Sequence, residues 1–390
     1  MTSSRPTLQR LLSSGREVAW TASSDLLRRA DLAIADAYAL AGFGLRDERV
    51  RAFLEATGDQ PVAAALSIAV TSLADTHTPS GTHPGTVISP AVTWAQQQQL
   101  STDADLARRA LIVGYEVCGR LGELARPQSP AAMRMTSIAG AAGAAAAIGT
   151  VLGLHLEQTA SAMSFAIQAA NGRNQWALEG TDDEIVHAGA ALTAARDGIR
   201  YAESGFLGSA TLLEGIRGFG LSSGHAVPTG RHPVILSLFH KRVQACLFAQ
   251  SAAQAAREIS AAHDGGDDPF PVTVRVAPWI AEYPGCNCND PGLLASSQRR
   301  ILSIQFAVAA ELCRAVHWTG FIDPAQTDAI IGVATKIQLV SDPSLSGLQA
   351  VVSTAPGAVA VCKDPESMTL VELQDRAAAA QSEVSTPHMN

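Results

Sequence analysis

The chain has 390 residues, of which 47% are apolar and only 16% are charged, and its formal net charge is -8. This composition favours a packed globular protein over a disordered one, and it leaves no basic surface for nucleic acid or anionic lipid. The first residues lack an apolar core followed by a cleavage site, and no window of about 18 uncharged apolar residues is present. We therefore expect a cytoplasmic protein with neither nucleic acid nor a membrane as its partner.

From residue 24 to about residue 254 the apolar residues recur with the spacing of buried helix faces, and strand patterns are almost absent. Ser89 precedes Pro90 as a cap residue would, which predicts a helix that begins at Pro90. The Gly/Ala-rich stretch 139–144 has no preceding strand and no following Lys-Ser/Thr, so it indicates close helix packing and not a nucleotide loop. The predicted helices are, in chain order, 26–40, 61–73, 90–99, 103–124, 136–154, 157–170, 183–203 and 246–259.

A polar turn rich in Gly and Asp at residues 262–269 marks a boundary, after which the pattern changes. Residues 271–276 alternate like a strand. We therefore predict a mainly α protein with a large all-helical domain over 1–262, a smaller α+β domain over 263–365, and a C-terminal helix and tail over 366–390. The other elements predicted after the boundary are helices at 297–316, 323–335 and 369–380 and strands at 336–340 and 348–353.

The six cysteines lie far apart, except for Cys286 and Cys288, which one residue separates. This spacing suits neither a zinc ribbon nor a redox Cys-x-x-Cys motif. We expect reduced thiols, no bound metal and no cofactor.

The segment from Asp75 to Pro90 is polar and lies between two apolar helical segments. Pro79 and Gly81 exclude a continuous helix, so we expect an irregular loop of the kind on which catalytic residues are often placed. The loop carries His77 and His83 beside a carboxylate and several hydroxyls. A metal hydrolase that uses both histidines and an acidic partner is one alternative, but the chain lacks the helical spacing of a zinc-binding histidine pair.

Two further polar clusters follow along the chain. Glu184 and His187 are three residues apart near the start of a predicted helix, so they share one face, and such a pair can transfer protons near neutral pH. A helix start with favourably placed acids and a buried, hydrogen-bonded histidine would give the same pattern. Lys241, together with Arg134, could bind carboxylates, and a solvated basic turn is the alternative.

Taken together, the three clusters resemble the MmgE/PrpD family, which includes 2-methylcitrate dehydratases, cis-aconitate decarboxylases and iminodisuccinate epimerases. The Asp75-Thr76-His77 turn followed by His83-Pro84-Gly85 is similar to the family's first active-site loop. Residues 205–219 are similar to its "Leu-Glu-Gly" and "Gly-Phe" signature, residues 241–246 to its "Lys-x-Tyr-Pro-x-Cys" segment, and residues 303–306 to the start of a long helix in its lid.

This resemblance implies an α+β lid over the active site, a homodimer, and acid/base chemistry beside carboxylates that needs no metal. The reactions of the family are loss of water, loss of carbon dioxide and epimerisation. The chain is shorter than typical members at its C-terminal end, so we expect the final helix that returns to the large domain to be reduced.

The resemblance extends to only part of the family's site. It implies that Thr76 and His83 line the pocket, that His187 is the histidine of a "Lys-x-x-His-x-Gly" motif, and that Lys241 binds a carboxylate or transfers a proton. Five positions depart from the family pattern. Ser72 stands where the family has an aspartate, Glu184 replaces a lysine, Arg134 replaces a histidine, Phe306 replaces the lid tyrosine, and Gln250 replaces a common histidine.

The exchange of a lysine for Glu184 reverses a charge in a pocket for polyanions. At ~4 Å, in a medium with an effective dielectric constant of about 20, such a reversal changes binding by several kcal/mol. A citrate-like trianion should therefore bind poorly unless Arg134 compensates. We expect a substrate with fewer carboxylates, or one with an amine or imine that faces Glu184.

Our leading hypothesis is a lyase or isomerase that acts on a small organic acid or a biosynthetic intermediate. His83 and His187 are the acid/base candidates, with Glu184 tuning His187, while Lys241 and Arg134 hold an anionic group. The alternative is a repurposed member, which binds a ligand or a partner protein without the ancestral reaction or has become cyclase-like. The remaining candidates for substrate contacts are Thr76, Asp75, His77, Ser72, Gln250 and Phe306.

Overall fold

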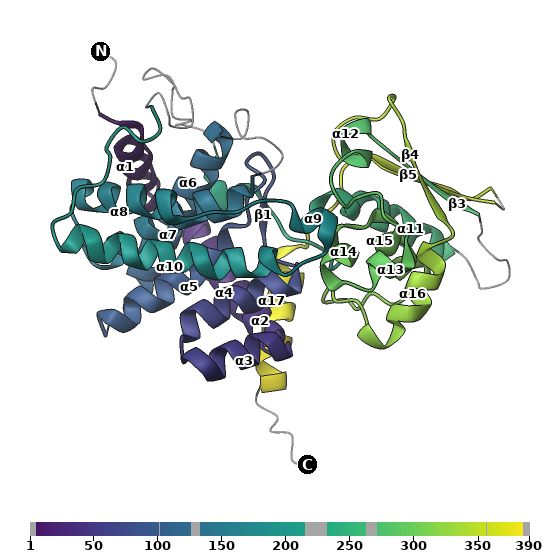
Figure 1. Ribbon diagram of the computed structural model, residues 1–390, viewed down its shortest axis with the longest axis horizontal. Coiled ribbons are helices and arrows are strands. Elements are labelled where there is room, and N and C mark those ends of the chain that lie inside the picture. The colour runs from purple at the N-terminus through teal and green to yellow at the C-terminus, as the bar shows by residue number, and fades with distance from the viewer. Residues whose placement is uncertain are drawn as a thin grey trace.

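A computed structural model describes residues 5–100, 102–125, 133–214, 232–262, 271–355 and 357–384. Within these ranges the chain forms two bodies that lie beside each other (Figure 1). The first consists of helices apart from one two-residue strand pair, and the second combines helices with a four-stranded sheet. Helices dominate the described residues, so the prediction of a mainly α protein is confirmed.

The first body is built on long helices, several of which begin at a polar cap residue. The side chains of Ser23 and Asp59 accept hydrogen bonds from the backbone N–H groups of Leu26 and Val62. Such caps are favoured because the first N–H groups of a helix have no partner within it. The helices are α1 (Thr7–Trp20), α2 (Ser24–Gly44), α3 (Glu48–Thr57), α4 (Gln60–Thr71), α5 (Pro84–Gln98), α6 (Ala104–Ala125), α7 (Met135–Val151), α8 (Leu156–Ala169), α9 (Trp176–Glu179) and α10 (Asp183–Glu203).

Helix α7 lies at the centre of this body, and all of its residues are buried. It packs against α5, α6, α8 and α10. Small residues permit the close approach, because a Cβ atom on Gly143 would lie only 2.6 Å from the carbonyl oxygen of Gly114 on α6. The Gly/Ala-rich stretch therefore serves helix packing.

The start of α5 differs from the sequence prediction. The helix begins at Pro84, with His83 as its cap residue, so Pro90 lies inside the helix and not at its first position. The reason is a long-range contact: the N–H of Gly85, which has no partner within the helix, donates to the carboxylate of Asp75 at 2.9 Å. Pro84 meets the preference for proline at a helix start as well as Pro90 does.

The sequence pattern also fails to predict α1 and α3. In α1 the apolar periodicity is interrupted by Ser13, Ser14 and Gly15. Gly15 is nevertheless well placed, because a Cβ atom there would lie 3.2 Å from the carbonyl oxygen of Val113 on α6. Tertiary packing thus outweighs a weak local preference for helix.

The second body combines short helices with a sheet. Its elements are α11 (Gln250–Ala262), β3 (Val272–Val276), α12 (Pro278–Ala281), α13 (Pro291–Leu294), α14 (Ser297–Leu302), α15 (Ile304–Leu312), α16 (Thr327–Ala334), β4 (Ile337–Ser341), β5 (Ala350–Thr354) and β6 (Val359–Cys362). The strand order is β4-β3-β5-β6. β3 is parallel to β4 and antiparallel to β5, with Val274 aligned with Leu339 and Val352. Helices α11 and α15 pack on each other and contact the sheet.

The single helix predicted over 297–316 is divided at Ser303. The Ser303 hydroxyl accepts a hydrogen bond from the N–H of Phe306 and so caps α15, and it donates to the carbonyl of Cys288 at 2.6 Å. A serine that bonds to nearby backbone groups offers an alternative to a continuous helix. The division of this helix follows from that alternative.

The buried apolar residues form two main clusters, which divide between Ile235 and Val243. Helix α11 belongs to the second cluster, although the sequence analysis places it in the helical domain. The division of the core therefore differs from the boundary expected at residue 262. Helical periodicity shows that α11 has a buried face, but it does not show which body covers that face.

The chain returns to the first body through α17 (Leu370–Val384), which packs against α2. Figure 1 shows α17 in yellow beside the purple α2. Arg376 donates from Nε to Oδ1 of Asp36 at 2.8 Å, and both side chains are buried. Arg242 and Glu372 form a second ion pair at 2.6 Å, which ties α17 to the segment before α11.

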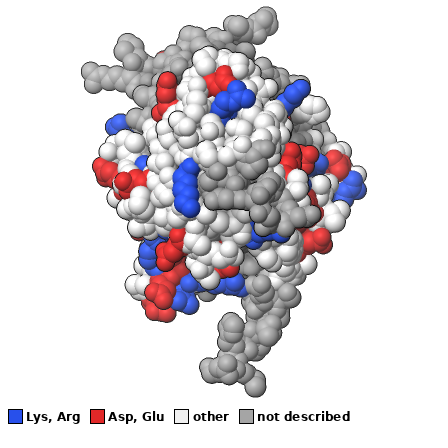
Figure 2. All heavy atoms as spheres, turned by 90° about the vertical axis from the view of Figure 1, so that its right-hand side faces the viewer, with Lys and Arg blue, Asp and Glu red and all other residues white. Residues whose placement is uncertain are grey.

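The described surface carries both signs of charge. Figure 2 shows one face of the molecule, on which acidic and basic side chains are interspersed. Such mixing gives this face no strong field of a single sign. Among the helices within the described ranges, none has both the length and the apolar run needed to cross a bilayer.

Candidate active site

A cavity of about 530 Å³ lies where the two bodies meet. This volume lies within the range of small-molecule sites. The first body supplies the loop before α5, the start of α7, α9 and the start of α10, and the second supplies residues around α12 and the end of α14. Six of the site residues expected from the sequence line the cavity: Ser72, Thr76, His83, Arg134, Glu184 and Lys241.

A short strand pair brings two of the polar clusters together. β1 (Thr76–His77) runs antiparallel to β2 (Leu238–Phe239), with Thr76 opposite Phe239. Close to this pair, Lys241 donates from Nζ to the carbonyl oxygen of Ser72 at 2.8 Å. Ser72 ends α4 in a left-handed conformation, with φ 55°. It therefore contributes its backbone carbonyl as the partner of Lys241.

His83 lines the cavity as a neutral imidazole. Its Nδ1 lies 2.9 Å from the carbonyl oxygen of Asp75 and 3.0 Å from the hydroxyl of Thr76. A carbonyl oxygen can only accept, so Nδ1 carries the proton and Nε2 keeps a free lone pair. Burial, followed by the charges of Lys241 and Arg134, holds the pKa of His83 well below its usual value. At neutral pH the ring can therefore accept a proton at Nε2.

Asp75 does not line the cavity. Its side chain holds in place the loop that carries His83. Its carboxylate accepts hydrogen bonds from the N–H of Gly85 at 2.9 Å and from the hydroxyl of Tyr115 at 2.8 Å. Burial raises the pKa of Asp75, while these two hydrogen bonds act in the opposite direction. A Cβ atom on Gly85 would lie 2.9 Å from Oδ2 of Asp75, so this position requires glycine. Asp75 is thus a positioning residue for the loop that carries His83.

Arg134 and Glu184 form an ion pair in the cavity wall. Trp176 stands beside the pair, with the guanidinium carbon of Arg134 5.5 Å from its ring centroid. Oε2 of Glu184 and Nε1 of Trp176 are buried without a hydrogen-bond partner among the described residues. Arg134 therefore balances the charge that Glu184 introduces, and the wall retains one unused acceptor and one unused donor.

Lys241 is a second cation in the wall, and burial lowers its pKa to about 8. The thiol of Cys246 lies near it and also lines the cavity. A hydrogen bond from Cys286 lowers the pKa of Cys246, and the charge of Lys241 acts in the same direction. Because its pKa is about 8, Lys241 carries its proton in most molecules at pH 7 and loses it under mildly alkaline conditions.

His187 does not line the cavity. It lies one turn beyond Glu184 on α10, and its Nδ1 is buried without a hydrogen-bond partner in the described ranges. The hydrogen bond of Glu184 goes to Arg134 and not to His187. A spacing of three residues places two side chains on one face of a helix, but it does not pair them when a stronger partner is available.

Three other expected site residues also lie away from the cavity. His77 is buried and bonds through Nδ1 to the hydroxyl of Ser80 at 2.8 Å. Gln250 accepts from the N–H of Arg242 at 3.1 Å, and Phe306 packs in the hydrophobic cluster of the second body. No group of three or more His, Cys, Asp or Glu side chains that could hold a metal ion occurs in the described ranges.

The second body contributes an apolar wall that the sequence analysis does not predict. The ring of Phe248 lies 5.1 Å from that of Trp279 and 4.7 Å from that of Tyr283, centroid to centroid, and all three line the cavity. The second body supplies no charged side chain among the described lining residues. Trp279 and Tyr283 lie close together in the sequence but far from Phe248, so only the tertiary structure reveals the three as one wall.

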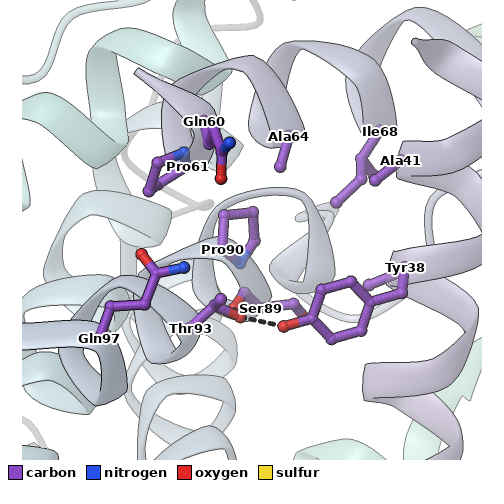
Figure 3. A pocket seen from close by; sticks show the side chains of 11 residues that line it. Tyr38, Ala41, Gln60, Pro61, Ala64, Ile68, Ser89, Pro90, Thr93 and Gln97 are labelled. Carbon is purple, nitrogen blue, oxygen red and sulfur yellow. Dashed lines mark hydrogen bonds between the residues drawn. The ribbon is translucent and has the colours of Figure 1, made fainter. Parts of the chain in front are cut away.

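A second hollow, of about 230 Å³, lies between α2, α4 and α5 (Figure 3). In its wall the hydroxyl of Tyr38 is hydrogen-bonded to that of Thr93. None of its described lining residues is a charged side chain or a histidine. The larger cavity, which contains His83 and Lys241, is therefore the candidate active site.

Residues 60–226 match the family model described as the MmgE/PrpD N-terminal domain. The match spans the His83 loop, Arg134 and Glu184, and it ends before Lys241. Of the signature segment at 205–219, residues 215–219 lie outside the described residues. No curated protein gives a significant match to the chain.

Proposed function

Because residues 60–226 make the chain a member of the MmgE/PrpD family, we propose that it is a lyase or an isomerase that moves a proton on a small organic acid. One observation carries this proposal: His83 is neutral, and its Nε2 has no hydrogen-bond partner among the described residues, in a cavity that also contains the cation of Lys241. A neutral imidazole beside a carboxylate-binding ammonium group is suited to acid/base catalysis.

His83 is the base in this proposal. Its Nε2 accepts a proton from a carbon next to a substrate carboxylate, and the electron pair stays on that carbon. In a lyase the pair then forms a double bond with the neighbouring carbon and expels hydroxide, which leaves as water with the proton that Nε2 has taken up. In an isomerase the pair takes up a proton from solvent on the opposite face. The bonds from Nδ1 to Asp75 and Thr76 hold the ring in the tautomer that this step needs.

Lys241 binds the carboxylate in this proposal. Negative charge spreads onto that carboxylate as the proton leaves, so an ammonium group fixed beside it favours the transition state over the ground state. Lys241 is held in place by its hydrogen bond to the carbonyl of Ser72. We assign no contact with the substrate to His187, because it does not line the cavity.

We propose that the second body acts as the lid of the site. It supplies Phe248, Trp279 and Tyr283, which line the cavity together with the polar residues of the first body. Exclusion of water by such a wall strengthens the electrostatic interactions at His83 and Lys241.

One observation favours a second candidate function, a protein that binds a ligand without reaction. Glu184 and Arg134 stand where the resemblance places a lysine and a histidine, and they bond to each other. A pair that satisfies itself contributes less to catalysis than two free groups.

A deuterium-exchange assay tests the proposal. The protein is incubated in D2O with mono-, di- and tricarboxylic acids that carry a proton next to a carboxylate, and NMR follows deuterium incorporation. We expect exchange with the wild-type protein, a loss of about 10²–10⁴-fold in His83→Gln, and retention in His77→Gln. Undiminished exchange in His83→Gln would overturn the role of His83. No exchange by the wild-type protein with any acid would favour the binding protein.

A further inference from the structure

The charged side chains among the described lining residues of the cavity all lie outside the second body. Arg134, Glu184 and Lys241 are the Asp, Glu, Lys and Arg side chains among the described lining residues, and His83 is neutral. Two cations and one anion leave a single positive charge, and Arg134 already has Glu184 as its partner. Lys241 is thus the one described lining cation without a carboxylate partner, and it matches one substrate carboxylate.

A substrate with several carboxylates would leave charges unmatched. The second carboxylate would have to compete with Glu184 for Arg134, and a third would face the uncharged wall of the second body. Burial of an unpaired carboxylate is strongly unfavourable. The distribution of charge therefore selects against the citrate-like trianion.

The wall that the second body supplies is suited to an apolar group. Phe248, Trp279 and Tyr283 present their rings there in edge-to-face contact, and Trp279 remains 42% exposed although it is a large aromatic residue. Aromatic side chains that are already ordered by their neighbours bind an apolar group with little loss of conformational entropy. A small polar acid would leave this surface in contact with water.

The charged wall also contains an unused acceptor and an unused donor. Oε2 of Glu184 and Nε1 of Trp176 have no hydrogen-bond partner among the described residues, and both residues are more than nine-tenths buried. Buried polar atoms of this kind are normally satisfied by a ligand or by water when the protein provides no partner. A hydroxyl or an amine on a ligand would donate to Glu184, and a hydroxyl would also accept from Trp176.

We propose that the substrate is an amphipathic monocarboxylic acid, with its carboxylate at Lys241, a hydroxyl or amine at Glu184, and an apolar body against Phe248 and Trp279. This inference rests on the proposed function and names the substrate class of the same site. It distinguishes this chain from an enzyme for small polyanionic acids.

Isothermal titration calorimetry with two probes tests the charge and the shape of the site. 3-Phenylpropanoate is a monoanion with an aromatic body, and tricarballylate is a small trianion. We expect 3-phenylpropanoate to bind the wild-type protein at least about tenfold more tightly than tricarballylate. Equal affinities, or tighter binding of tricarballylate, would overturn the proposal.

Two pairs of variants assign the binding to the two walls. Trp279→Ala should lower the affinity for 3-phenylpropanoate about tenfold. The control is Trp318→Ala, which removes an exposed tryptophan outside the cavity and should leave this affinity unchanged. Glu184→Gln frees Arg134 and should raise the affinity for tricarballylate about tenfold. The control is Asp183→Asn, which changes the net charge of the protein by the same amount outside the cavity and should leave the affinity for tricarballylate unchanged. Loss of the difference between either variant and its control would overturn the assignment of that wall.

Circular dichroism establishes whether each variant is folded before titration, and Trp279→Phe replaces Trp279→Ala if the latter unfolds. Binding does not require turnover, so the two proposals fail separately. Tight binding of 3-phenylpropanoate without deuterium exchange on any acid would overturn the proposed function and leave the ligand class standing. Exchange that depends on His83 but occurs only with tricarboxylic acids would overturn the substrate class and leave the proposed function standing.

Discussion

Nε of Arg376 lies 2.8 Å from Oδ1 of Asp36, although 340 positions separate the two residues in the chain. Asp36 also lies 3.6 Å from Nδ1 of His240, the residue that precedes Lys241. The last helix thus contacts the second helix at the place where the Lys241 segment is held. This contact links the end of the chain to the geometry of the candidate active site.

Arg376→Met should destabilise the protein by about 3–5 kcal/mol, because it leaves the buried carboxylate of Asp36 without its main partner. Urea unfolding followed by circular dichroism measures the change. Arg28→Met is the matched control, since Arg28 forms an exposed pair with Asp25 at 3.1 Å and its loss should cost less than about 1 kcal/mol. Equal losses in the free energy of unfolding of the two variants would contradict a stabilising role for the buried pair.

The pH dependence of kcat/KM should follow Lys241 on the alkaline side. The pKa of His83 is held well below 6.5 by burial and by nearby cations, so this base stays unprotonated through the neutral range. Lys241, with a pKa of about 8, loses its charge above that pH, and carboxylate binding weakens. We expect kcat/KM, measured with an acid that undergoes exchange, to be level from pH 6.5 to about pH 7, to reach about half of that value near pH 8 and to fall further above it.

Lys241→Met should abolish this alkaline limb and lower kcat/KM at pH 7 by about tenfold or more. The control is Lys363→Met, which removes an exposed lysine outside the cavity and should leave the profile unchanged. If the alkaline limb persists in Lys241→Met, it arises from the titration of another group.

Lys241 should also make stability depend on pH. Its pKa is about 8 in the folded protein, against 10.5 as the ordinary value. Between these values the unfolded chain holds a proton that the folded protein has released, so the free energy of unfolding rises with pH, by up to about 3 kcal/mol. Urea titrations of the wild-type protein and Lys241→Met at several pH values measure the difference. Parallel curves for the two proteins would contradict the shift.

Gly85→Ala should disturb the His83 loop. The added Cβ atom would lie 2.8 Å from the hydroxyl of Tyr115 and 2.9 Å from the carboxylate of Asp75, so the loop must move, with a loss of about 1–3 kcal/mol in stability. Thermal unfolding and the exchange assay measure the two effects. In Gly332→Ala, where no atom of the described residues lies within 4 Å of the new Cβ, we expect no loss of either property.

Local sequence patterns predict the helices well where a helix is bounded by its own residues. Helix α10 runs from Asp183 to Glu203 as expected, because acidic residues mark its start and Gly205 follows its end. The start of α5 at Pro84 depends instead on the distant Asp75 carboxylate. No local pattern contains that information.

In the candidate active site, too, local sequence patterns predict some residues, whereas others depend on contacts between distant segments. His83, Lys241, Arg134 and Glu184 are polar residues in noticeable clusters, and the cavity brings them together. Phe248 gives no such indication in the sequence, because an aromatic residue at helical spacing is most often part of a core. Its role in a cavity wall emerges only from the packing of the second body.

The strand pair that places Thr76 opposite Phe239 joins two segments that are far apart in the chain. Contacts between distant segments carry a larger loop-closure cost and form late in folding. The cavity should therefore be completed after most of the helices have formed. A ligand that touches both walls binds only the completed form, so it should raise the melting temperature of the protein.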